Sequence, residues 1–310
     1  MLKMRIPFLS SVNNSLTRAK KAASTFEKEK NISGQVKALS LLGECKANLN
    51  QCDQSLEILN RSKALTLAHF KAESSEVANA YYYLARSLGG CARKHVEAID
   101  MMHQSINLKR KLFGEAVEVA FDYNYMGYMF TNLAQHDSAF YYLQKALSIR
   151  QKKLPTDDIE LANTFYNLAR NYENQYELNK ALELHLKALK IRSAKLNAGH
   201  ESLANSLHQI GSAYQKLGNY DRALEYCNRA LEISIKSLGP VHTNVAANYL
   251  TIGNLHGFMF NYREAIRFIK EGNSILEKLY GDKSDILPTY EAYLGRLYGN
   301  VGEHASALNS

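Results

Sequence analysis

Tryptophan is absent from this sequence of 310 residues, and proline and cysteine occur only 4 times each. So few prolines exclude proline-rich linkers and argue against a strand-and-turn fold, because such folds need frequent chain breakers. The cysteines Cys45, Cys52, Cys91 and Cys227 lack the C-x-x-C spacing and the matching histidines of a zinc site. Their spacing also indicates no disulfide framework, and we expect reduced, mostly buried thiols.

Long apolar runs are missing as well. Near the N-terminus the apolar stretch covers only residues 6–9, which is too short for the core of a secretory signal. No later segment approaches the roughly 18 apolar residues that a membrane-spanning helix needs. We therefore expect a cytoplasmic protein that does not enter a membrane.

The sequence also lacks catalytic signatures. None of its 10 histidines falls in the H-E-x-x-H spacing of a zinc protease. Neither a glycine-rich phosphate loop nor the G-x-S-x-G turn of a hydrolase nucleophile occurs. We expect no enzymatic activity, no metal ion and no cofactor.

Acidic residues are fewer than basic ones, 30 against 38, which gives a net charge of +8. Such an excess is compatible with an acidic partner or with a nucleic acid. The basic residues are scattered, however, and the densest runs are only Lys20-Lys21 and Lys109-Arg110-Lys111. Scattered charge is typical of solvated helical faces, so no nucleic-acid partner is expected.

What the sequence does contain is an internal repeat. A small residue recurs every 42 residues, each time after an aliphatic one, at Gly43, Ala85, Gly127, Ala169, Gly211, Gly253 and Gly295. A second small residue follows 12 positions later, at Ser55, Ala139, Ala181, Ala223, Ala265 and Ala307. The second repeat departs by one, because its corresponding residue, Ala98, lies 13 positions on. This predicts one extra residue in the turn between Ser87 and His95.

Each repeat predicts two amphipathic helices, because its apolar residues recur at spacings of three and four. The small residues permit close approach of two antiparallel helices, since each leaves room for a bulky side chain of the other. Polar stretches predict turns between the helices at residues 174–176, 217–219 and 261–262. Residues that accept a left-handed backbone predict the ends of second helices near Gly114, Asn197, Gly239 and Gly281.

The pattern Phe165-x-x-Leu168-Ala169-x-x-Tyr172, followed by Ala181 and Ala188, resembles the tetratricopeptide repeat. That repeat is about 34 residues long, so a period of 42 lengthens each second helix by about two turns. The period of 42 and the sequence pattern, as in residues 223–233 and 237–242, are similar to those of the repeats of kinesin light chains. The coiled coil of those light chains has no counterpart here. The resemblance implies an all-α fold, a right-handed superhelical solenoid of antiparallel helix pairs.

The resemblance covers residues 35–310, as about seven repeats of which the last is incomplete. Residues 1–34 break the register. Their small and apolar side chains, among them Ala19, Ala23 and Phe26, can line one face of a capping helix; a disordered or vestigial leader is the alternative. The sequence ends as the second helix of the seventh repeat begins, so we expect a fragment with a further repeat or an effector domain after residue 310.

In the family, the first helix of each pair lines a concave surface that grips peptides. The positions six and three before the small residue and one after it lie on the helix face opposite the buried leucine and tyrosine anchors. Besides Phe121, they predict a peptide-binding groove lined by Asn79, Tyr82, Arg86, Asn124, Tyr128, Asn163, Tyr166, Arg170, Asn205, His208, Ser212, Asn254 and Arg296. Amides, aromatic rings and guanidinium groups suit a peptide backbone with acidic or aromatic side chains. The alternative is that these are ordinary exposed residues; the recurrence of Asn and Arg at fixed offsets favours a groove. For His208 and for His185, packing or solvent exposure is the favoured role.

Three functions remain as hypotheses. The first is a scaffold or adaptor that binds peptide segments of partner proteins, as the resemblance to kinesin light chains implies. The second is the regulatory or sensor portion of a larger signalling protein, such as an ATPase, protease or kinase, whose effector domain lies outside this sequence. The third and least favoured is nucleic-acid binding.

Overall fold

Helices account for all regular secondary structure in the residues that the computed structural model describes, 7–281 and 285–302, with side chains from residue 15 onward. The chain forms two compact units, Met1–Gln175 and Tyr176–Ser310, and the boundary falls within the fourth repeat. The first unit contains α1 (Pro7–Lys28), α2 (Ile32–Asn48), α3 (Cys52–His69), α4 (Ser75–Arg86), the π-helix η1 (Ser87–Cys91), α5 (His95–Phe113), α6 (Val117–Asn132), α7 (His136–Lys153) and α8 (Ile159–Asn174). The second contains α9 (Leu178–Lys195), α10 (Glu201–Lys216), α11 (Tyr220–Leu238), α12 (Thr243–Phe258), α13 (Tyr262–Tyr280) and α14 (Leu287–Asn300).

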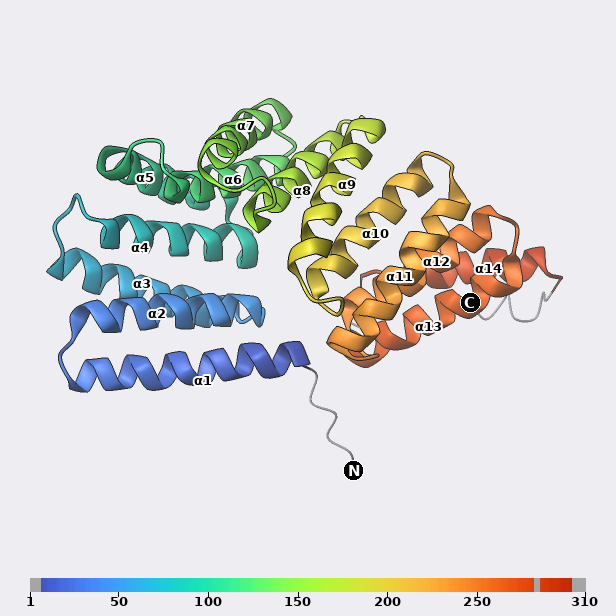
Figure 1. Cartoon of the computed structure of the whole chain (residues 1–310). Helices are drawn as coiled ribbons and strands as arrows, with labels where there is room; N and C mark the ends of the chain where they lie inside the picture. Colours follow the sequence, from blue (N-terminus) through green and yellow to red (C-terminus); the bar gives the residue numbers. More distant parts are fainter. Residues whose placement is uncertain (1–6, 282–284, 303–310) are drawn as a thin grey trace. The chain divides into compact units, whose positions relative to one another are not determined.

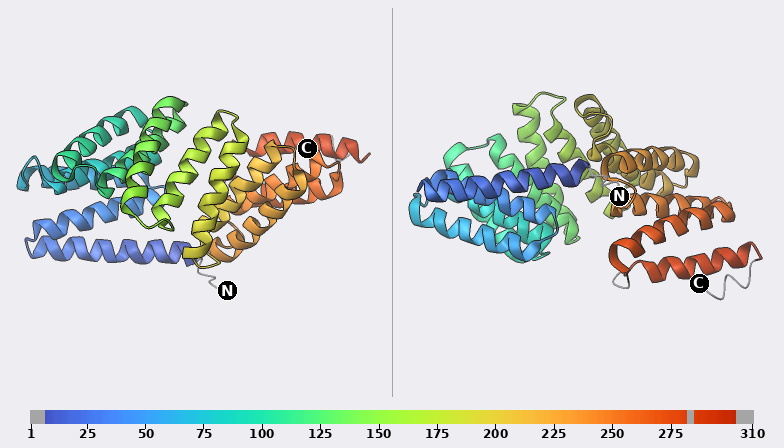
Figure 2. Two further views of the ribbon diagram at one scale, coloured as in Figure 1. Left: turned by 45° about the horizontal axis from the view of Figure 1, so that its top comes forward. Right: turned by 90° about the horizontal axis from the view of Figure 1, so that it is seen from below.

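Within each unit every helix packs against the next one along the chain, and Figure 1 shows them as successive antiparallel rods. The same succession is visible from other sides in Figure 2. First helices also meet: α2 contacts α4, α6 contacts α8, and α10 contacts α12. The predicted all-α solenoid of helix pairs is therefore confirmed at the level of repeat stacking.

Close packing inside the pairs depends on the recurring small residues. A β-carbon on Gly127 in α6 would overlap the side chain of Leu143 in α7. The same holds for three further pairs, Gly43 with Leu59, Gly211 with Cys227 and Gly253 with Ile269. In each case the glycine accepts a side chain 16 positions later, so the predicted role of the small residues is confirmed. The aliphatic residues that precede them are buried: Leu42, Leu84, Met126, Leu168, Ile210, Ile252 and Leu294.

Polar pairs fasten consecutive repeats to one another. Lys109 on α5 contacts Asp122 on α6 at 2.7 Å, and Ser105 donates to the same carboxylate at 2.6 Å. Arg150 on α7 donates to the Thr164 hydroxyl on α8 at 2.6 Å. In the second unit the corresponding pairs are Arg192 with Ser206 at 2.6 Å and Asn248 with Ser234 at 3.2 Å. The first-helix partner lies five residues before the small residue each time, so the polar pairs follow the repeat.

The turns inside the repeats hold a left-handed residue. Tyr176 has φ 61° and Gly218 has φ 76°, at the turns expected over residues 174–176 and 217–219. The third turn lies slightly earlier than expected, because Phe260 is the left-handed residue and Tyr262 already begins α13. Second helices end at Gly114, Gly239 and Gly281 with positive φ, as predicted.

Helix α9 ends near Asn197, as predicted, but Asn197 is not left-handed. Helix α9 is capped one residue earlier, by Leu196 in an extended conformation with φ −105° and ψ 151°. An extended backbone directs the chain away from the helix without a left-handed residue.

The extra residue of the second repeat is accommodated in η1 at the end of α4. A π-helix closes its hydrogen bonds over five residues instead of four, so it absorbs one inserted residue. Such a bond joins the amide of Ala92 to the carbonyl of Ser87 at 3.0 Å. The predicted insertion between Ser87 and His95 is thus confirmed.

The segment before the repeats begins with α1, which packs on α2. Ala19 and Ala23 are buried, and Phe26 packs with Ala38 and Leu39 of the first repeat. This is the contact that a capping helix makes. The division at residues 34 and 35 and the count of seven repeats remain predictions, and Ala307 in the last repeat lies outside the described residues.

None of the helices in the described part of the chain combines the length and apolar character needed to cross a membrane.

Candidate functional site

Two hollows open on the first-helix face of the first unit. One, the Arg86 hollow, has a volume of about 270 Å³ and lies where α2, α4, η1 and α6 meet. Its polar lining consists of Glu44, Asn48, Asn50, Tyr83, Arg86, Ser87, Tyr125 and Tyr128. The other, the Lys37 hollow, has a volume of about 330 Å³ and is lined from α2 and α4 by residues that include Lys37, Ser40, Glu76 and Asn79. Tyr83 lines both hollows.

Arg86 forms an ion pair with Glu44, which lies 42 residues earlier in the neighbouring first helix. Both side chains are only partly exposed, at 36% and 26%. Glu44 occupies the same offset from Gly43 that Arg86 has from Ala85. Glu44 is not among the predicted groove residues, because these begin in the second repeat; the same offset in the first repeat identifies it.

The guanidinium groups of Arg86 and Arg170 flank two tyrosines on α6. The carbon Cζ of Arg86 lies 6.0 Å from the ring centroid of Tyr125, and that of Arg170 lies 5.4 Å from the ring centroid of Tyr128. The two tyrosine rings are themselves 5.4 Å apart. We call these four residues the arginine–tyrosine row; it crosses three successive first helices, α4, α6 and α8.

The hydroxyl of Tyr125 donates to the backbone carbonyl of Arg86 at 2.9 Å and thereby ties α6 to the end of α4. Burial raises the pKa of the Tyr125 phenol above its ordinary value. The phenol therefore stays protonated and continues to act as a donor.

Tyr82 remains a predicted groove residue. Like Tyr83 it packs against the core, and its ring centroid lies 5.6 Å from the Cζ of Arg86. The Nζ of Lys109 lies 4.4 Å from its ring centroid, and burial raises the pKa of Tyr82 to about 12. Its neighbour Tyr83 is the ring that lines the hollows. On a helix, successive side chains are rotated by about 100°, so one residue decides which ring reaches the site.

The remaining predicted residues of the first unit occupy varied positions. Asn79 is exposed and lines the Lys37 hollow. Asn163 donates to Glu160 at 3.3 Å, and Arg170 donates to Asn132 at 3.2 Å. The buried Oδ1 of Asn124 has no hydrogen-bond partner among the described residues. Two aromatic residues complete this group, the half-buried Tyr166 and Phe121, which lies beneath the guanidinium of Arg150.

In the second unit several predicted residues contact the next first helix. The Nδ1 of His208 lies 2.9 Å from the Oδ1 of Asn248, and Asn205 accepts from Asn244 at 3.4 Å. Asn254 donates to the hydroxyl of Tyr290 at 3.2 Å. Arg296 lies over Tyr293, and Ser212 is half-buried. The favoured packing role of His208 matches its contact with Asn248, which is itself buried.

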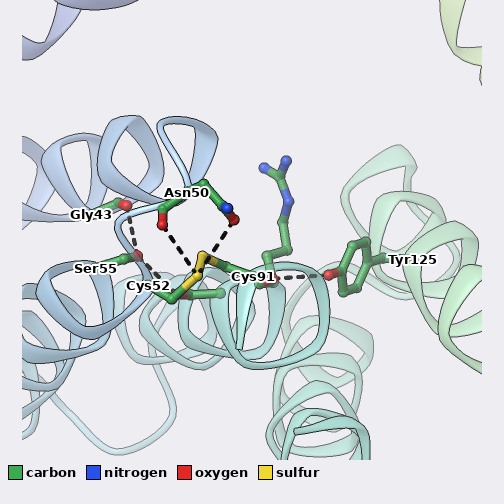
Figure 3. Close-up of a disulfide and its surroundings, with 8 residues drawn as sticks. Gly43, Asn50, Cys52, Ser55, Cys91 and Tyr125 are labelled. Atoms are coloured by element: carbon green, nitrogen blue, oxygen red, sulfur yellow. Dashed lines mark hydrogen bonds between the residues drawn. A yellow bond between two sulfur atoms is a disulfide. The ribbon is translucent and has the colours of Figure 1, made fainter. Parts of the chain in front are cut away.

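A disulfide joins Cys52 at the start of α3 to Cys91 in η1, beside the Arg86 hollow (Figure 3). The expectation of reduced thiols is therefore wrong for this pair, and it holds for Cys45 and Cys227, which are buried and free. Burial raises the pKa of the Cys227 thiol to about 12. The missed signal is the separation of 39 residues, because residues about one period apart, such as Glu44 and Arg86, are spatial neighbours in stacked repeats.

No group of histidine, cysteine and acidic residues in the described ranges is arranged to hold a metal ion. The arrangement offers amides, phenols and paired charges on a hollowed surface. These groups bind a ligand through hydrogen bonds and ring contacts.

The sequence profile of the tetratricopeptide repeat matches residues 119–194, 160–223 and 202–272. Residues 119–272 contain tetratricopeptide repeats. Among curated proteins, no sequence matches the chain.

Solved structures of low sequence identity share the fold. The apo form of RapI is 19% identical with a TM-score of 0.69, and the match covers 97% of this chain and 82% of RapI. A Rap protein complexed with competence and sporulation factor is 15% identical with a TM-score of 0.58, over 96% of this chain and 95% of that one. A putative kinesin light chain of Podosopora anserina with nearly identical tetratricopeptide-like repeats is 18% identical over 81% of this chain and 98% of that one; its TM-score of 0.39 adds nothing to the fold assignment.

Proposed function

We propose that the chain is a non-catalytic adaptor that binds peptide segments of partner proteins on its first-helix face. The observation that carries this proposal is the pair of hollows that share Tyr83 beside the arginine–tyrosine row. The volumes of about 270 and 330 Å³ lie near the lower end of the range for small-molecule pockets, about 300–1,000 Å³. Each hollow therefore fits a side chain better than a large cofactor.

The chemistry of the face suits an extended peptide. Asn48 and Asn50 at one hollow and Asn79 at the other can exchange hydrogen bonds with peptide amides. The faces of Tyr83 and Tyr125 offer stacking to an aromatic side chain. These groups repeat along neighbouring helices, as a ligand that runs across the helices requires.

The two arginines differ in what they offer an acidic side chain. Arg86 already pairs with Glu44, so a ligand carboxylate must compete with that residue. Arg170 contacts a ring and an amide, Tyr128 and Asn132, and keeps its charge for a ligand. We therefore assign the acidic side chain of the peptide to Arg170.

Two comparisons support this role. The resemblance to kinesin light chains implies binding of acidic, aromatic-containing peptides. A protein of the same fold is complexed with competence and sporulation factor, so the fold accommodates a bound partner. We also propose that the protein is cytoplasmic. Disulfides in the cytoplasm are usually transient or redox-sensing, so the bond between Cys52 and Cys91 would belong to that class.

Selection from a displayed peptide library, followed by fluorescence anisotropy with the selected peptide, tests the proposal. Tyr83→Ala and Arg170→Gln are expected to weaken binding about tenfold or more, as residues central to an interface do. The matched controls are Tyr141→Ala and Arg61→Gln on second helices, which are expected to change affinity less than about twofold. A library that yields no binder, or equal losses in variants and controls, would overturn the proposal.

A further inference from the structure

The disulfide between Cys52 and Cys91 spans the wall of the Arg86 hollow. It joins the first residue of α3 to the last residue of η1, with 5.4 Å between the two Cα atoms. Cys91 and Asn50, the residue two before Cys52, both line the hollow. Figure 3 shows the bond beside Asn50 and near Tyr125, whose hydroxyl fixes the carbonyl of Arg86.

In the segment that the bond restrains, residues 87–93, the first three residues are buried, whereas residues 90–93 are exposed or half-buried. The segment contains the π-turn, two adjacent glycines at Gly89 and Gly90, and Arg93 with φ 55°. Glycine pairs, π geometry and a left-handed non-glycine residue all lower local stability. Besides the disulfide, the segment is held by the buried Leu88 and by Gly89, which packs on Met129. Its hydrogen bonds include the contact between the hydroxyls of Ser87 and Ser55 at 2.8 Å and two backbone bonds, from Ala92 to Ser87 and from Lys94 to Leu88.

Both bonded cysteines are half-buried, so the bond is within reach of a small thiol. The free cysteines, Cys45 and Cys227, are buried, and burial raises the pKa of both thiols. Neither is poised to exchange with the bond, because the thiolate is the attacking form.

We propose that the bond is a redox clasp: a dithiol reductant opens it, releases residues 87–93 and reshapes the Arg86 hollow. The effect on peptide binding rests on the function proposed above. One thiolate of the reductant attacks Cys52 or Cys91 and forms a mixed disulfide. Its second thiol then displaces the protein sulfur, so the reductant leaves as a disulfide and the protein gains two electrons and two protons as two thiols.

Hydrogen–deuterium exchange of the intact chain, oxidised and then reduced with dithiothreitol, tests the clasp. Exchange in residues 87–93 is expected to rise about tenfold or more on reduction, because local opening governs exchange. The internal control is residues 129–134, the corresponding turn of the next repeat, which contains no cysteine and should not change. Reoxidation is expected to restore the slow exchange.

A variant with Cys52→Ser and Cys91→Ser separates the clasp from side effects of the reductant. It is expected to exchange rapidly over residues 87–93, to keep its helical circular dichroism, and to show no response to dithiothreitol. Unchanged exchange in this segment on reduction overturns the proposal. Loss of helicity throughout the first unit also overturns it, because the bond would then be a structural staple.

The consequence for binding has a separate readout. A fluorescein-labelled peptide, selected on the oxidised chain, is expected to bind the reduced chain about tenfold more weakly than the oxidised chain. In the control variant Tyr141→Ala the ratio of the two affinities should be the same. Equal affinity for both forms would overturn the link to the hollow. If the oxidised chain selects no peptide, the proposed function fails, and the exchange experiment still decides the clasp.

Discussion

Arg170 on α8 lies over the ring of Tyr128 on α6, with its guanidinium carbon 5.4 Å from the ring centroid. A cation held against a ring is positioned before a ligand arrives, and less side-chain entropy is lost on binding. Arg86 on α4, the preceding first helix, makes a similar contact with Tyr125 on α6, at 6.0 Å from its ring centroid. The first-helix face of the first unit is therefore ordered in advance by contacts between repeats.

Replacing Gly127 by alanine is expected to destabilise the chain by about 1–3 kcal/mol, because the new β-carbon overlaps Leu143 in a packed core. Gly299→Ala in α14 is the matched control, since no atom lies within 4 Å of its new β-carbon. There the better helix propensity of alanine should be neutral or slightly stabilising. Urea unfolding followed by circular dichroism measures both; equal midpoints would contradict the packing role of Gly127.

Removal of one partner from the buried pair of Lys109 and Asp122 is expected to lower the free energy of unfolding. Lys109→Met leaves the fully buried Asp122 without its cation, a loss of about 3–5 kcal/mol. Adding Asp122→Leu removes the stranded carboxylate and should recover most of that stability. Thermal unfolding of the two variants compares them, and a double variant no more stable than the single one would refute this account.

Acidification is expected to destabilise the second unit through His242. Its Nδ1 accepts from the backbone amide of Asn244 at 3.1 Å, and burial lowers its pKa below 6.5. The unfolded chain therefore binds the proton more readily, so this contribution to stability is complete above about pH 6.5 and is lost as the pH falls.

His242→Asn keeps a capping side chain but does not titrate. Between pH 7.5 and 5.5 the variant should lose less stability than the parent chain in urea unfolding. An identical loss in both proteins would show that His242 does not contribute.

The left-handed turn residues predict a stabilising substitution. Ala134 has φ 56°, a conformation that costs a residue with a β-carbon about 1–2 kcal/mol and glycine almost nothing. Ala134→Gly is expected to gain up to about 1 kcal/mol after the entropy of the unfolded glycine is subtracted. Ala198→Gly, in a turn without positive φ, should instead be destabilising. A melting temperature that falls in both variants would contradict the strain at Ala134.

The repeat architecture could be predicted from the sequence because it rests on local rules. A small residue every 42 positions and apolar spacings of three and four specify helix pairs with close contacts. The sequence shows the inserted residue near Ser87 as a break in register. It does not show that this residue is accommodated as a π-turn. That form depends on how η1 packs against α2 and α3, which is a tertiary contact.

The site was less predictable because its contacts join residues one period apart. Glu44 and Arg86 are neighbours only once the repeats stack, and so are Cys52 and Cys91. Tyr83, which follows Tyr82 on α4, lines both hollows, and the offset rule does not identify it. The buried polar pairs were not predicted, because apolar periodicity gives no signal for a polar side chain in the core.

The most direct test of the central claim, peptide binding on the first-helix face, is hydrogen–deuterium exchange with and without saturating selected peptide. The account predicts slowed exchange in α2 and α4 and around Tyr125 and Tyr128, with no change in α3 and α5. Slowed exchange confined to α3 and α5 would contradict it.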